Sequence, residues 1–211
     1  KGEEYTARVV VSNASAYNTF YKMFPQEEHM NDYLTRLENY SVSLSSFQVF
    51  LGLKDDIVTK LGITDSEIFM ETGYDIEQSY RNCMHAEVEE GGYALTLYDN
   101  ILDGYSPEGK NTLNIMTLQG YDHWEPYAGD YFNGNKSAYR EEKERMAEIL
   151  ITKVEETLLP GLRDAIEVKE IGTPLTNIRM YIEMLEQGIA CDRDREQDDQ
   201  QGQLLLKGNW P

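Results

Sequence analysis

The three histidines are the residues of this chain best suited to bind a metal ion, but their spacing does not fit that role. His29, His85 and His123 are far apart, and none forms a spaced ligand pair with another. His123 stands beside Asp122 and near Glu125 in "GYDHWEP", which groups an imidazole with two carboxylates. We predict turn or surface roles for all three histidines, and no metal site.

Nucleophilic hydrolysis has no better support. The stretch "SVSLSS" supplies several serines, but the chain contains no G-x-S-x-G nucleophile elbow. Cys83 and His85 are too close in sequence to form a catalytic dyad, so helix packing is the better interpretation. Acid pairs such as Glu141 and Glu142 are typical of a solvated helix face. The sequence therefore identifies no catalytic acid, base or nucleophile.

The opening stretch points to nucleotide binding. Residues 9–11 are an unbroken run of valines, as in a strand buried on both faces of a parallel sheet, and a turn follows it. A nucleotide-binding sheet of this kind carries a glycine-rich phosphate loop after its first strand. The chain contains no G-x-G-x-x-G motif. The strand is thus predicted without the loop that should accompany it.

The amino-acid composition of the chain limits the kinds of partner that it can bind. The 211 residues are enough for one sizeable core, and 40% of them are hydrophobic, which is ordinary for a globular protein. The net charge of −19 repels phosphate groups, so we expect no nucleic-acid partner and only hydrophobic contact with any membrane. No apolar run approaches the roughly 18 residues of a spanning helix, and no targeting segment is visible. We expect a cytoplasmic or membrane-peripheral protein with Cys83 and Cys191 as free thiols.

The hydrophobic patterns predict a mixed α+β fold. Strands are expected where apolar residues alternate, and helices where they recur every three or four residues. In the longest helix, Glu141 and Arg145 stand at the favoured i, i+4 spacing. The strands on either side of the turn "GYSPEGKN" should pair antiparallel, which gives a largely antiparallel sheet flanked by helices. The expected strands are 44–53, 66–72, 93–101, 112–120 and 165–172, and the expected helices 15–24, 25–40, 75–92, 135–159 and 178–188.

Several stretches, taken in order, resemble one family of flavoproteins. They are "ARVVVSNASAYNTFYKMF", "SLSSFQVFLGL", "PEGKNTLNIMTLQGYDHWEP", "YREEKERMAEILITKVEETLLPGLRDAIEVKEIGTPLTN" and "LLLKGNWP". Each alone is a weak signal, but their combination resembles the phytoene desaturase, carotenoid isomerase and retinol saturase group. The resemblance covers residues 6–179 and resumes over 204–211.

The resemblance implies a domain organisation. In that group the glycine-rich fingerprint lies far upstream of a strand like the opening one, so we expect a chain that begins well inside such a protein. Residues 1–14 and 204–211 would be remnant strands of an FAD-binding sheet, and 15–179 would be the substrate-binding domain. Residues 180–203 would be a short helical stretch followed by an acidic loop or disordered segment. FAD would belong to the parent protein, and none is expected on this chain.

The resemblance also implies site residues. Ser12, Asn13 and Ala14 would lie near the flavin, because ligands of open α/β sheets bind beyond the carboxyl ends of the strands. Ala14 and Gly208 should then share one edge of the flavin sheet. The set expected near the flavin is Ser12, Asn13, Ala14, Gly208, Asn209 and Trp210, and the set expected to contact substrate is Phe47, Phe50, Met116, Trp124, Thr173 and Pro174.

The implied substrate is a polyene such as a carotenoid or retinoid, which the parent enzyme would desaturate, isomerise or saturate. We expect a face built from the strands 44–53 and 112–118 to be uncovered and apolar, and therefore to drive self-association or dye binding. Two alternatives stay open. One is a non-catalytic binding module for a lipophilic ligand or a protein partner, which should have a closed surface. The other is an amine-oxidase-like flavoprotein, which would need an aromatic cage with a polar end.

Overall fold

The computed structural model describes residues 5–14, 16, 19–24, 30–40 and 43–186 of the chain. The chain divides into two compact units, residues 1–42 and 43–210, which are described separately. Gly208, Asn209 and Trp210 lie outside the described residues, and so does the expected C-terminal strand. The predicted side-by-side arrangement of Ala14 and Gly208 therefore stays a prediction.

The smaller unit contains two helical segments in its described part. A five-residue π-helix, η1 (Thr19–Met23), lies where the sequence pattern predicts a helix over 15–24. The second expected helix is α2 (Asn31–Glu38). Phe20 and Tyr33 join the two segments, with their ring centroids 4.6 Å apart.

The strand predicted for residues 9–11 does not form. Residues 5–14 are irregular, and Val9, Val10 and Val11 are 79%, 75% and 90% exposed. A strand needs a neighbouring strand to satisfy its backbone N–H and C=O groups, and the described part of residues 1–42 supplies none. The β-branched run therefore favours a strand, but the described part of this unit by itself cannot provide the partner strand that is needed.

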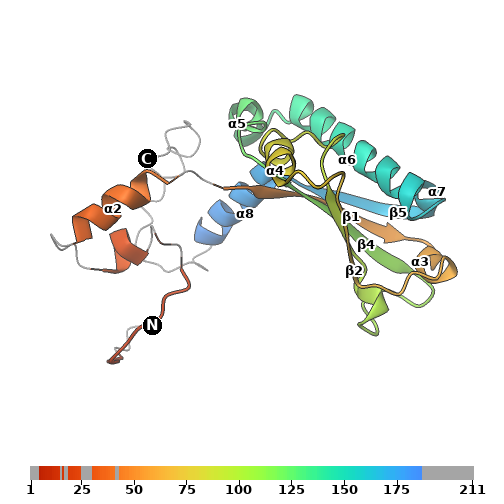
Figure 1. Cartoon of the computed structure of the whole chain (residues 1–211), viewed down its shortest axis with the longest axis horizontal. Coiled ribbons are helices and arrows are strands. Elements are labelled where there is room, and N and C mark those ends of the chain that lie inside the picture. Colours follow the sequence, from red (N-terminus) through yellow and green to blue (C-terminus); the bar gives the residue numbers. More distant parts are fainter. Residues whose placement is uncertain (1–4, 15, 17–18, 25–29, 41–42, 187–211) are drawn as a thin grey trace. The chain divides into compact units, whose positions relative to one another are not determined.

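The larger unit is a sheet with helices packed against it (Figure 1). Its elements include five strands and three helices that overlap the expected ranges, although the helix expected over 75–92 ends at Met84, and also short helices over 57–60, 125–132 and 162–165 that the sequence did not predict. In chain order they are β1 (Ser45–Leu53), α3 (Ile57–Lys60), β2 (Glu67–Met70), α4 (Ile76–Met84), β3 (Tyr93–Thr96), η3 (Tyr98–Asn100), β4 (Asn111–Gln119), α5 (Glu125–Phe132), α6 (Ser137–Thr157), α7 (Leu162–Ala165), β5 (Ile166–Gly172) and α8 (Pro174–Glu186).

The five strands lie in the order β2-β3-β4-β1-β5, and every neighbouring pair is antiparallel. The long strands β1 and β4 are central and pair along their whole length, from Ser45 opposite Gln119 to Leu53 opposite Asn111. This arrangement confirms the predicted α+β class with a largely antiparallel sheet.

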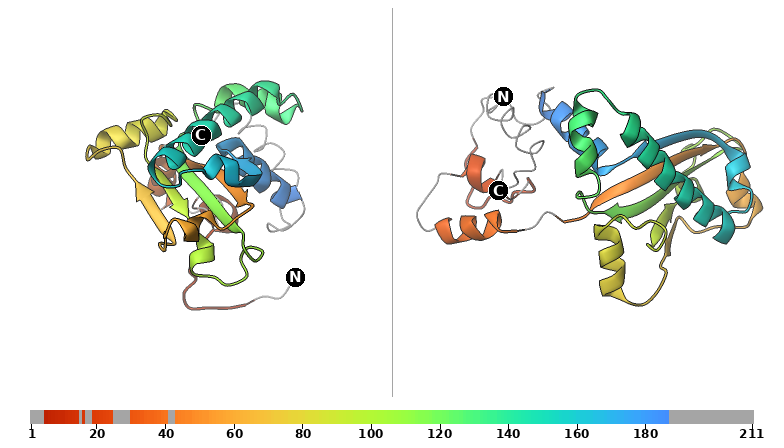
Figure 2. Two further views of the ribbon diagram at one scale, coloured as in Figure 1. Left: turned by 90° about the vertical axis from the view of Figure 1, so that its right-hand side faces the viewer. Right: turned by 90° about the horizontal axis from the view of Figure 1, so that it is seen from above.

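Helices α5 and α6 pack on one face of the sheet, which we call the covered face (Figure 2). Period-two alternation places every second residue of a strand on this face, and those residues form the core. The helices contribute an apolar stripe to the same core. Core residues of the sheet include Phe47, Val49, Leu51, Leu113 and Ile115, and those of the two helices include Ala128, Tyr131, Met146, Ala147, Leu150, Ile151 and Val154.

Two local predictions need correction. Arg145 does not pair with Glu141 but forms ion pairs with Glu142, one residue further on, and with Glu89 from the segment after α4. The helix expected over 178–188 begins earlier, at Pro174, within the stretch "IGTPLTN", and is α8. Thr173 caps that helix by accepting a hydrogen bond from the Thr176 N–H at 3.3 Å, and Pro174 occupies its first position.

Candidate functional site

The face of the sheet opposite the covered face, which we call the open face, is the candidate site. Its side chains are half-exposed or exposed at most positions, as Phe50 (46%), Leu118 (45%) and Val168 (55%) illustrate. They mix apolar and uncharged polar groups with a few carboxylates at the sheet edges. The open face consists of Glu67, Phe69, Ala94, Thr96, Ser46, Gln48, Phe50, Gly52, Thr112, Asn114, Met116, Leu118, Val168, Glu170 and Gly172.

The structure does not bring together all the residues expected to contact substrate. Phe50 and Met116 lie on the open face. Phe47 and Trp124 belong to the core, where both are fully buried and their rings stack with centroids 5.9 Å apart. Thr173 is also fully buried, and its hydroxyl lies 3.0 Å from that of Tyr139 on α6. The two sets therefore face opposite sides of one sheet.

The expected flavin-facing residues at the N-terminus lie in an irregular, exposed segment. The Ser12 hydroxyl lies 2.8 Å from the hydroxyl of Thr19 and accepts a hydrogen bond from the Ala14 N–H at 3.3 Å. A dinucleotide site needs a strand that leads through a glycine-rich turn into the N-terminus of a helix. The described residues of this segment do not have that geometry, so they do not fit FAD by themselves.

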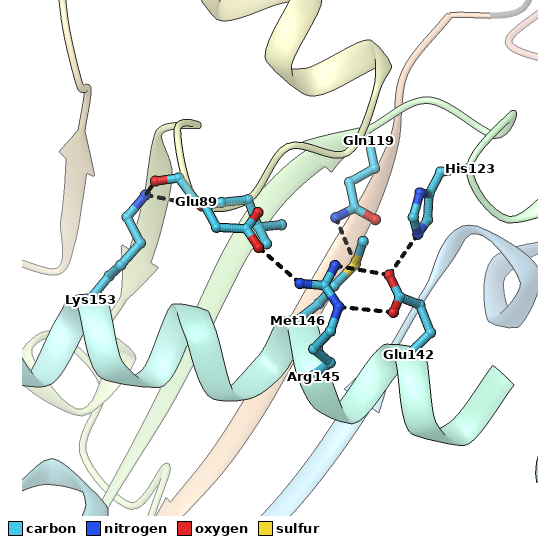
Figure 3. A network of polar contacts seen from close by, with 8 residues as sticks. Glu89, Gln119, His123, Glu142, Arg145, Met146 and Lys153 are labelled. Carbon is cyan, nitrogen blue, oxygen red and sulfur yellow. Dashed lines mark hydrogen bonds and ion pairs between the residues drawn. The ribbon is translucent and has the colours of Figure 1, made fainter. Parts of the chain in front are cut away.

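A polar network lies around α6 in the larger unit (Figure 3). Glu142 accepts two hydrogen bonds from the Arg145 guanidinium, at 2.9 and 3.0 Å, and lies 2.9 Å from Nε2 of His123. Arg145 also donates to Glu89 at 2.8 Å. Lys153, two turns further along α6, donates to the backbone carbonyls of the segment that contains Glu89. The network joins three segments that are distant in sequence.

These contacts give His123 a structural role, because its Nε2 faces a carboxylate that is already bound by arginine. Among the described residues, no three His, Cys, Asp or Glu side chains are grouped as metal ligands would be. Cys83 is a free thiol whose pKa is raised by burial and by the nearby Glu71 carboxylate, which makes it a poor nucleophile at neutral pH.

The network should make stability depend on pH. Hydrogen bonds from Arg145 hold the pKa of Glu142 below its usual 4.5, against the opposing effect of burial, and His123 adds to the lowering. Because the folded-state pKa is the lower one, the stabilisation is present above about pH 4.5 and is lost as the pH falls through the folded-state value. We expect Glu142→Gln to lower the free energy of unfolding at pH 7 by about 1–2 kcal/mol, and by less at pH 3.

Urea unfolding at several pH values would measure this difference. Glu141→Gln is the matched control, since Glu141 is the exposed neighbour of Glu142 on the same helix. A Glu142→Gln deficit that stays constant from pH 7 to pH 3 would contradict the assignment.

A shallow hollow of about 320 Å³ lies beside the N-terminus of α4. Its walls are polar and acidic, which does not suit an apolar ligand. They consist of Thr72, Gly73, Asp75, Gln78, Ser79, Asn82, Glu87 and Glu90.

No helix in the described part of the chain is long and apolar enough to span a membrane.

Comparisons with known proteins show which proteins the chain resembles in sequence. No family model matches the chain. It is 29% identical over 178 residues to the chloroplastic prolycopene isomerase of Daucus carota and 26% identical over 178 residues to that of Arabidopsis thaliana. It is also 26% identical over 188 residues to the all-trans-retinol 13,14-reductase of Danio rerio.

Each alignment covers 84% of this chain but only 26%, 27% and 31% of the respective relative, so the chain spans about a quarter to a third of their length. The chain is thus an α+β protein that is homologous to part of larger isomerases and reductases. The chain is related to the carotenoid isomerase, desaturase and saturase group, and the resemblance seen in its motifs is confirmed.

Proposed function

We propose that this chain is the substrate-binding domain of an FAD-dependent oxidoreductase or isomerase that acts on a polyene, and that the open face forms one wall of the polyene site. The observation that carries the proposal is the alignment with enzymes named for prolycopene and for all-trans-retinol. In the complete enzyme the flavin would supply the redox chemistry, and this domain would position an apolar chain against it.

The open face has the properties that a polyene wall requires. Phe50 and Met116 occupy its two central strands, and Phe69 extends it onto an edge strand at 70% exposure. A long, flat hydrocarbon gains free energy by covering such side chains over an extended area. The covered face cannot serve, because helices already occupy it.

The isolated chain should not retain FAD. The sequence lacks the glycine-rich loop that binds the pyrophosphate, and residues 5–14 do not fold as the strand expected to belong to the flavin sheet. Purified chain is expected to release no flavin on denaturation, measured by absorbance near 450 nm. Flavin released in near-stoichiometric amount would refute this expectation.

The proposal that the open face forms one wall of the polyene site is tested by ligand binding. We expect the chain to enhance the fluorescence of all-trans-retinol, and Phe50→Ser to weaken the binding about tenfold, since an aromatic contact of 1–2 kcal/mol is lost. Tyr74→Ser is the matched control, because Tyr74 is fully exposed outside the open face. Circular dichroism of both variants would establish that they fold.

The competing reading is a self-contained binding module with a closed surface. An uncovered apolar face should bind a hydrophobic dye or cause self-association that increases with concentration. Sedimentation over a concentration series, with dye fluorescence alongside, separates the two. A strictly monomeric chain that binds neither the dye nor retinol would favour the module and count against the substrate-binding domain.

A further inference from the structure

A row of amide side chains crosses the middle of the open face. The Gln48 Nε2 group donates to the hydroxyl of Ser46 at 3.0 Å, and the Asn114 Nδ2 group donates to Gln48 Oε1 at 3.3 Å. The row ends at Asn114 Oδ1, which is screened from solvent and has no hydrogen-bond partner in the part of the chain that the structure describes. A screened acceptor without a partner is uncommon and costly, so it calls for a physical explanation.

The position of this acceptor suggests a ligand. Asn114 lies on β4 directly opposite Phe50 of β1, and Met116 is the next residue of β4 on the same face. Asn114 is therefore a neighbour of two of the side chains proposed to contact the polyene. Phe50 is 46% exposed, so a ligand that contacts it on the open face would lie beside Asn114, and a shift of the neighbouring side chains would give the ligand access to the oxygen.

Resting on the proposed function, we infer that Asn114 is a specificity residue that selects a polyene alcohol over a hydrocarbon polyene. The hydroxyl of the alcohol donates a hydrogen bond to Asn114 Oδ1, whereas a hydrocarbon leaves this acceptor buried and unpaired. Sites that contain a polar group for a substrate hydroxyl discriminate strongly against analogues without it. The names of the relatives include both kinds of polyene, prolycopene and all-trans-retinol, and the acceptor favours the second.

The test compares all-trans-retinol with its methyl ether, in which a methyl group replaces the hydrogen that the hydroxyl donates. The unmodified chain is titrated with each, and binding is followed by retinoid fluorescence. We expect retinol to bind about tenfold more tightly, because the ether cannot donate to Asn114. Asn114→Leu, which keeps the side-chain size, should bring the two affinities within about twofold of each other. Asn133→Leu, the same substitution at the exposed end of α5, should preserve the preference.

The outcomes distinguish this inference from the proposed function. Equal affinity of the unmodified chain for retinol and the ether would overturn the role of Asn114 and leave the polyene wall intact. A preference that survives in Asn114→Leu would overturn it as well. Failure of both ligands to bind would refute the proposed function and the inference together. The comparison on the unmodified chain is informative even if Asn114→Leu does not fold.

Discussion

Replacing Trp124 by alanine is expected to lower the free energy of unfolding by about 3–5 kcal/mol, the range for removing a large aromatic side chain from a core. Trp124 is fully buried between Phe47 and Tyr139, with ring centroids 5.9 and 5.8 Å away. Its indole N–H donates to Gln119 Oε1 at 2.8 Å, so the substitution also leaves a buried amide oxygen without its partner.

The measurement is urea unfolding followed by circular dichroism, since the substitution removes one of the two tryptophans of the chain and so changes the fluorescence signal itself. Phe50→Ala is the control, because Phe50 is also a large aromatic residue of the larger unit but lies on the open face. We expect that change to cost less than about 1.5 kcal/mol, as the side chain is already half-exposed. If Trp124→Ala left stability unchanged but abolished retinol binding, Trp124 would belong to the substrate site after all.

Replacing Gly120 by alanine is expected to destabilise the domain by about 1–3 kcal/mol through steric conflict. The added methyl group would lie 2.3 Å from the carbonyl oxygen of Met84, the last residue of α4. The same region is held by a hydrogen bond of 2.9 Å from the Gly120 N–H to the carbonyl of Cys83. Relief of the conflict therefore requires the end of α4 to move away from the end of β4.

Gly129→Ala is the matched control for this substitution. Gly129 lies within α5, and a methyl group there meets no atom within 4 Å. Alanine is the better helix former, so we expect this change to raise the midpoint of thermal unfolding slightly. Equal effects of the two substitutions would show that the contact between Gly120 and α4 is not tight in solution.

From these results, we expect the two faces of the sheet to have different roles, one in folding and the other in ligand binding. The covered face contains Trp124, Phe47 and the stripe of α6, and its substitution should act on folding. The open face contains Phe50, Asn114 and Met116, and its substitution should act on the proposed polyene binding. Measuring stability and retinol affinity on the same variants separates the two effects.

The sequence alone determined the strands and the longer helices α4, α6 and α8 of the larger unit, although not α3, α5 or α7, and the group of proteins to which the chain is related. Alternation from Phe47 to Leu53 predicted β1, and the apolar stripe around Leu150 predicted α6, because both patterns depend only on local backbone geometry. The same alternation already separated Phe47 from Phe50, although both were expected to contact substrate. The strong local pattern of the valines at 9–11 was not sufficient to predict their structure, because a strand there depends on partner strands elsewhere in a sheet.

The tertiary structure decided which face of the sheet is covered. A period-two pattern assigns residues to two faces, but only the packing of a helix from another part of the chain makes one of them the core. The pairing of Arg145 with Glu89 and the burial of Trp124 depend on contacts between distant segments in the same way. So does the unpaired oxygen of Asn114, which becomes visible only when β1 and β4 are placed side by side. Such contacts are set by chain topology, which residue types and their spacing do not specify.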